Sequence, residues 1–139
     1  MFNIACRATV LCPSGPTNNL RQMHLFVLLT GPVRPPQFVL MAPINTIKSA
    51  QDDRSCVLRP GDHPFITNDS FLAYGRSRQI AASALTNGVN SRLFVEKDPV
   101  SEVLFARICA GLRTSEFTKP FALELFDEFH NPAPPKTAR

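Results

Sequence analysis

The 139-residue sequence lacks tryptophan, has a single tyrosine and contains only six glycines, against eleven phenylalanines and thirteen prolines. Phenylalanine must therefore supply most of the aromatic packing. The prolines favour stiff turns and few long helices, because proline fixes its own φ and interrupts helical hydrogen bonding. The length predicts one domain, over residues 1–130. The Pro-rich segment 131–139 has too little apolar content to pack a core, and we expect it to be disordered.

Long apolar runs and paired cysteine motifs are also missing. No stretch approaches the roughly 18 apolar residues of a membrane span, and the N-terminus has no charged start typical of a signal peptide. The four cysteines form no CxxC pair, and the three histidines do not cluster with them. We therefore expect a cytoplasmic protein with reduced thiols, no membrane partner, no metal site and no cofactor.

Acidic residues are absent from the first 51 positions, which hold the basic residues Arg7, Arg21, Arg34 and Lys48. The other 88 residues contain eleven bases and eleven acids, so the whole net charge of +4 belongs to the N-terminal third. A localised basic surface suits a polyanionic partner such as RNA, although short basic runs also serve only to solubilise a domain.

Two unbroken apolar runs, 25–29 and 38–44, predict strands buried on both faces. Only about eight residues separate them, which suits an antiparallel hairpin and is too short for a parallel crossover. His24 opens the first run, and Asn45 with Thr46 closes the second. If the strands are neighbours, these polar side chains share one rim.

The remaining pattern predicts short strands followed by helices. Further strands are expected at 4–11, 56–58, 63–67, 70–74 and 92–95, with 80–85 as strand or helix and a turn at Asn87-Gly88. Helices are expected at 98–112, starting at Asp98-Pro99, and at 119–129. The fold class is therefore α+β and β-dominant, with five to seven antiparallel strands and one or two C-terminal helices.

The stretch RQMHLFVLLTGP followed by FVLMAPINT resembles the PemK/MazF family of toxin endoribonucleases. The resemblance covers about residues 8–113 as an order of elements. It implies a small SH3-like barrel, metal-independent cleavage of single-stranded RNA within a toxin–antitoxin system, a homodimer and an antitoxin protein that covers the groove.

When the site positions of the family are transferred to this sequence, two of them hold a different residue type. His24 falls where the family has an arginine, with Arg21 three residues upstream. Asn45 falls where the family has a threonine or serine, with Thr46 next to it. The family's late strand lines the substrate groove, which points to Ser70, Tyr74 and Arg76, with Arg78 nearby.

Metal-free RNA cleavage needs a base for the ribose 2′-OH, donors for the charged phosphorane and an acid for the leaving oxygen. Histidine is suited to proton transfer near neutrality, arginine to phosphate binding, and threonine or asparagine to hydrogen bonding. His24, Arg21 and Thr46 are thus the predicted catalytic residues. The predicted substrate-binding residues are Asn45, Lys48, Ser70, Tyr74, Arg76 and His63.

Structural roles compete with each assignment. His24 can cap a sheet edge, Tyr74 can be a packed aromatic rather than a stacking platform, and Asp62 with His63 can stabilise a turn. A Cys56–His63–Asp62 nucleophile system is a further, weaker alternative. For the whole protein, the alternative to a ribonuclease is a non-catalytic SH3-like module that binds nucleic acid or a protein partner.

Overall fold

The computed structural model describes residues 2–13, 22–33 and 37–132. The elements follow one another as β1 (Thr9–Pro13), β2 (Met23–Leu28), β3 (Phe38–Thr46), β4 (Val57–Leu58), β5 (Ser70–Leu72), a 3-10 turn η1 (Tyr74–Arg76), β6 (Arg78–Ala81), α1 (Ala82–Asn90), β7 (Val95–Lys97), α2 (Glu102–Thr114) and α3 (Pro120–His130). The predicted α+β class with two C-terminal helices is confirmed. In the described ranges, no helix is both long and apolar enough for a membrane span.

The strands form one antiparallel sheet in the order β4-β5-β3-β2-β1-β7, and β6 pairs with the first half of β3. The predicted hairpin is confirmed, because β2 pairs with β3 in antiparallel register from Leu25↔Ile44 to Leu28↔Met41. The sheet order begins with β4 and ends with β7. Closure of this sheet into an SH3-like barrel stays a prediction.

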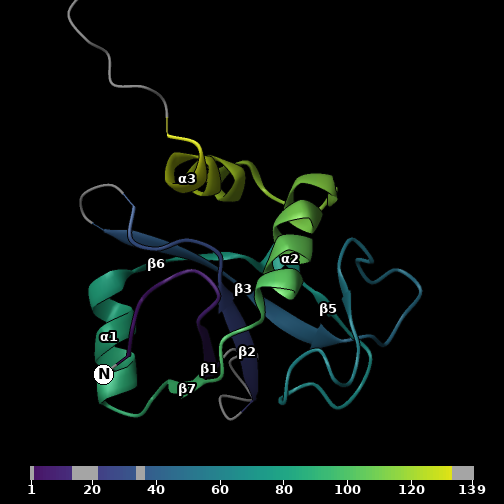
Figure 1. Cartoon of the computed structure of the whole chain (residues 1–139), viewed down its shortest axis with the longest axis horizontal. Helices are drawn as coiled ribbons and strands as arrows, with labels where there is room; N and C mark the ends of the chain where they lie inside the picture. The colour runs from purple at the N-terminus through teal and green to yellow at the C-terminus, as the bar shows by residue number, and fades with distance from the viewer. Residues whose placement is uncertain (1, 14–21, 34–36, 133–139) are drawn as a thin grey trace, which may run out of the picture.

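Each face of the sheet packs against different helices (Figure 1). Side chains alternate between the faces of a strand, so Leu25 and Val27 join the cluster with α2 and α3, whereas Phe26 and Leu28 join the cluster with α1. Both faces of β2 and β3 are therefore buried, which explains their unbroken apolar runs.

Several predicted bounds are wrong. The first strand starts at Thr9 rather than at residue 4, because Arg7 adopts a positive φ of 78° that interrupts extended backbone. The predicted strand 63–67 is a turn-rich loop. The segment 80–85 divides into the end of β6 and the start of α1, and the strand expected at 92–95 lies at Val95–Lys97.

The predicted Asn87-Gly88 turn lies inside α1. Gly88 is needed there for packing, since a Cβ at this position would collide with the Phe94 ring. The helix expected from Asp98 begins at Glu102 instead, because the Ser101 side chain accepts a hydrogen bond from Leu104 N at 3.1 Å and caps it.

Candidate functional site

A groove of about 740 Å³ lies at the end of the β2–β3 pair. It is lined by the start of β2, the end of β3, the middle of β5 and the segments that follow β3, β4 and β5. Its polar and aromatic lining residues are Gln22, His24, Asn45, Thr46, Lys48, Asp52, Phe65, Phe71 and Arg76. Five of the predicted site residues thus meet in one place: His24, Asn45, Thr46, Lys48 and Arg76.

The sheet register sets His24 and Asn45 side by side. They are the next residues beyond the pair Leu25↔Ile44, and Asn45 in turn pairs with Phe71 on β5. Directly opposed residues project to the same face of a sheet. His24, Asn45 and Phe71 therefore form a row across three strands on one face.

The His24 imidazole is half-buried and surrounded by positive charge. Burial lowers its pKa below the ordinary value of 6.5, and the charges of Arg76, Arg78 and Lys48 lower the pKa further. Both causes disfavour the imidazolium. The neutral ring, which is the form able to accept a proton, therefore predominates at pH 7.

Arg76 and Lys48 give the groove exposed cationic walls. Arg78 projects onto the same face, with its guanidinium 4.9 Å from the centre of the Phe26 ring. The carboxylate in the lining is Asp52, whose Oδ2 accepts hydrogen bonds from Lys48 N at 2.7 Å and Ser49 N at 2.9 Å. Asp52 thus stabilises the loop after β3. The positive charges around the groove are more numerous than this single carboxylate.

Asn45 has unused hydrogen-bonding capacity at the groove. Its Oδ1 atom is buried and accepts no hydrogen bond from any residue of the described ranges. A buried amide oxygen without a partner is costly, and most such groups in proteins are satisfied. The observation marks Asn45 as a polar side chain with an unsatisfied buried atom at the edge of the groove.

The other two predicted catalytic residues are Thr46 and Arg21. Thr46 lines the groove, but alternation along β3 turns its side chain to the face opposite His24. The sheet register therefore places Asn45, and not Thr46, beside the His24 imidazole. Arg21 lies outside the described residues.

Two predicted substrate-binding residues are buried and hydrogen-bonded within the protein. Tyr74 is 0% exposed, and its hydroxyl donates to the Ile108 carbonyl at 2.6 Å, which ties η1 to α2. Ser70 is buried, and its hydroxyl donates to the Asn68 carbonyl at 2.8 Å. Tyr74 therefore packs the core and has no face for a base.

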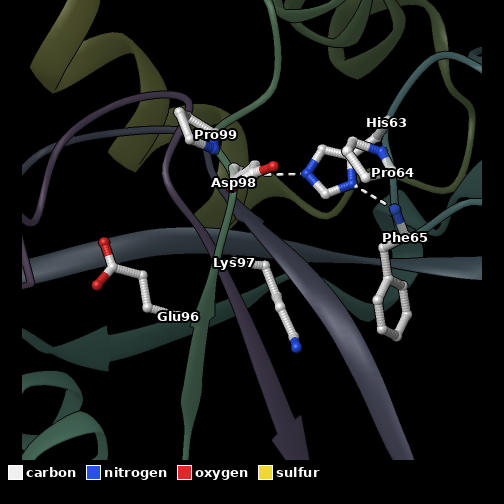
Figure 2. A pocket seen from close by; sticks show the side chains of 7 residues that line it. All are labelled: His63, Pro64, Phe65, Glu96, Lys97, Asp98 and Pro99. Atoms are coloured by element: carbon white, nitrogen blue, oxygen red, sulfur yellow. Dashed lines mark hydrogen bonds between the residues drawn. The ribbon is translucent and has the colours of Figure 1, made fainter.

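A third predicted substrate-binding residue, His63, is also buried. Its ring is 3% exposed, with Nε2 2.5 Å from the Asp98 carbonyl and Nδ1 3.0 Å from Phe65 N (Figure 2). Nδ1 accepts from the amide, so Nε2 carries the proton and donates. His63 thus clamps its loop to the segment after β7 and has no nitrogen left for a substrate.

The Cys56–His63–Asp62 alternative also fails. His63 bonds elsewhere, and burial raises the pKa of the Cys56 thiol. The predicted turn role of Asp62 is confirmed, since its Oδ2 accepts from Arg59 N at 2.8 Å. Within the part of the chain that the structure describes, no group of three or more His, Cys, Asp or Glu side chains could hold a metal ion.

Sequence reasoning did not assign the groove aromatics Phe65 and Phe71. Phe71 alternates with apolar neighbours and resembles any core residue. Phe65 follows Pro64 in the segment predicted as a strand, and its backbone amide is bonded to the His63 ring. Comparisons with family models, with curated proteins and with solved structures find no match to this chain.

Proposed function

We propose that the protein cleaves single-stranded RNA without a metal ion, at the groove that holds His24 and Asn45. The observation that carries the proposal is a half-buried imidazole, kept neutral by burial and by three nearby cations, beside an asparagine whose buried oxygen has no partner among the described residues. Neutral imidazole suits a general base, and the surrounding cations suit a phosphodiester.

In the proposed reaction His24 takes the proton of a ribose 2′-OH. The 2′ oxygen attacks the adjacent phosphorus, the bond to the 5′ oxygen breaks, and a 2′,3′-cyclic phosphate forms. The leaving oxygen takes a proton from solvent in the open groove and ends as a 5′-OH. A positioned general base contributes typically about 10²- to 10⁴-fold to such a reaction.

The charged phosphorane has donors in the same groove. Arg76 presents a bidentate guanidinium, Lys48 adds an ammonium, and the amide NH₂ of Asn45 donates beside the base. One preorganised donor of this kind is worth about 3 kcal/mol in a transition state. Arg21, Thr46 and the expected antitoxin and homodimer contacts stay predictions that rest on the family resemblance.

The test is product analysis. Purified protein incubated with a single-stranded RNA oligonucleotide in EDTA should give fragments that end in 2′,3′-cyclic phosphate and begin with 5′-OH. The same oligonucleotide made wholly of deoxynucleotides should stay intact, because it lacks the nucleophile. Intact RNA after incubation with folded protein would contradict the proposed activity. Growth arrest of cells that express the protein would in addition support a toxin function.

The second candidate is a non-catalytic nucleic-acid-binding module. It is favoured by the position of Thr46, which faces away from His24, while Lys48, Arg76 and Arg78 still make the groove basic. This function predicts salt-dependent binding of both RNA and DNA strands with no cleavage of either.

A further inference from the structure

Phe65 places an exposed phenyl ring on the wall of the basic groove. It is 44% exposed, although large apolar side chains are usually buried, and it lines the groove together with His24 and Arg76. The same residue lines a neighbouring pocket of about 510 Å³ with His63 and Lys97 (Figure 2). Phe65 thus stands between two hollows, one of which contains the proposed catalytic groups.

The Phe65 backbone is held from two sides. Its amide donates to His63 Nδ1 at 3.0 Å, and the next amide, Ile66 N, donates to the His63 carbonyl at 3.0 Å. His63 is itself bonded to the Asp98 carbonyl beyond β7. In Figure 2 the phenyl ring points away from the imidazole that fixes its backbone. The loop therefore holds in place the backbone that carries this ring.

Two other phenylalanines of the described residues are exposed, Phe117 at 48% and Phe129 at 38%. Phe117, the more exposed of the two, lines a hollow whose charged residues are Asp52, Asp53, Arg54 and Glu116. Carboxylates there repel a polyanion, whereas Lys48 and Arg76 attract one to the hollow at Phe65. The lining at Phe117 has one cation, Arg54, against three carboxylates, whereas the groove at Phe65 has two cations against the single carboxylate of Asp52. An exposed aromatic therefore coincides with a net positive lining at Phe65 and with a net negative one at Phe117.

We propose that Phe65 is the stacking platform for one nucleobase of a single-stranded nucleic acid bound in the groove, with His63 as its positioning residue. The inference rests on the proposed function and deepens it. A bare phosphate needs only the cations, but a nucleotide also offers an aromatic face. Stacking of this kind needs an unpaired base, so it selects single strands over duplexes.

The absence of tryptophan from the chain allows a direct test. Phe65→Trp makes the only indole of the protein a reporter inside the groove. Titration with a deoxyribose oligonucleotide, which this reaction cannot cleave, should quench its fluorescence. An abasic oligonucleotide of the same length and charge should bind through its phosphates and leave the fluorescence unchanged. Phe117→Trp is the matched control and should not respond to either ligand.

Phe65→Ala supplies the second measurement. It should weaken binding of the base-bearing oligonucleotide about 5- to 150-fold, the range of one stacked base, and leave binding of the abasic strand unaltered. Equal loss for both strands, or no loss for either, would overturn the stacking role. Absence of any oligonucleotide binding by the folded protein would overturn it together with the proposed function.

The two proposals fail separately. Quenching of Phe65→Trp without cleavage of any RNA would support the platform and contradict the nuclease. RNA cleavage that Phe65→Ala leaves at the wild-type rate and affinity would support the nuclease and overturn the platform.

Discussion

His24 and Asn45 lie side by side on β2 and β3, one residue beyond the last paired residues Leu25 and Ile44. Burial and three cations keep the imidazole neutral, and the amide oxygen next to it is buried without a partner in the described residues. Neither residue is unusual alone. Their juxtaposition at the open end of a strand pair makes the groove a place for proton transfer next to a phosphate.

The charge around His24 can be measured by titration. The imidazole should titrate below pH 6.5 in an NMR experiment on the ring protons, and Arg76→Ala should raise its pKa toward 6.5, since one repelling charge is removed. The pKa should remain lowered in the variant, because burial is the larger cause. Arg59→Ala, at an exposed arginine paired with Asp69, is the control and should change nothing. A pKa that falls or stays constant in Arg76→Ala would contradict the assignment.

The same shift predicts how stability depends on pH. The unfolded chain binds the His24 proton more tightly than the folded protein does, so the His24 contribution is fully present above pH 6.5. It is lost as pH falls through the lowered pKa. His24→Gln should therefore flatten the stability curve in this window, measured by urea unfolding at pH 5, 6 and 7. An unaltered curve would show that His24 is not the group responsible.

His63 should act as a structural clamp. Removal of its ring by His63→Ala takes one donor from the Asp98 carbonyl, which keeps the Thr9 hydroxyl as a donor, and leaves the Phe65 amide without its acceptor. The loss of these two hydrogen bonds should cost about 1–3 kcal/mol of unfolding free energy, measured by urea denaturation. His63→Asn keeps a side-chain acceptor that can reach the Phe65 amide but cannot span to Asp98. Compared with His63→Ala, His63→Asn should restore more of the oligonucleotide affinity that depends on Phe65 than of the unfolding free energy. Equal behaviour of the two variants in both measurements would argue against two separate roles of the ring.

Tyr74 should matter for folding and not for nucleic acid. Tyr74→Phe removes the hydroxyl that donates to the Ile108 carbonyl and should destabilise the protein by about 1–3 kcal/mol. Oligonucleotide affinity of the folded variant should equal that of the wild type, measured by fluorescence anisotropy. A selective loss of affinity would restore Tyr74 as a substrate contact.

The cations should set the salt dependence of binding. Lys48→Ala combined with Arg76→Ala should weaken single-strand binding and reduce the slope of log affinity against log salt by about 1.4, which corresponds to two lost phosphate contacts. Lys119→Ala, on the exposed start of α3, is the control. An unchanged slope in the double variant would place the nucleic acid elsewhere.

Sequence reasoning was most successful where one signal dominates. The apolar runs 25–29 and 38–44 and their short separation specify the β2–β3 hairpin, and the hairpin brings His24 to Asn45. Helix α3 falls within one residue of its prediction, because Pro120 marks its first turn. These features depend on local pattern alone.

The failures occur where tertiary contacts decide. By sequence, Tyr74 resembles an aromatic residue at a sheet edge. In the fold, α2 packs over it, and the Ile108 carbonyl accepts a hydrogen bond from its hydroxyl. Val103 follows Val100 at helical spacing in the predicted helix 98–112, which predicts an apolar stripe that includes it, yet Val103 is 76% exposed. The loop that carries Phe65 is held by a hydrogen bond from His63 to a carbonyl 35 positions away, which no short-range pattern reports.

The most direct test of the central claim is the rate of RNA cleavage by wild type and His24→Gln at pH 7 in EDTA, with both proteins shown to unfold at the same temperature. Glutamine keeps a polar side chain of similar size but cannot accept the proton. We predict that the wild-type protein cleaves a single-stranded RNA and that His24→Gln lowers the rate at least about 100-fold, with little change in affinity for the uncleavable deoxyribose strand. Equal rates for the two proteins would contradict the assignment of His24 as the base.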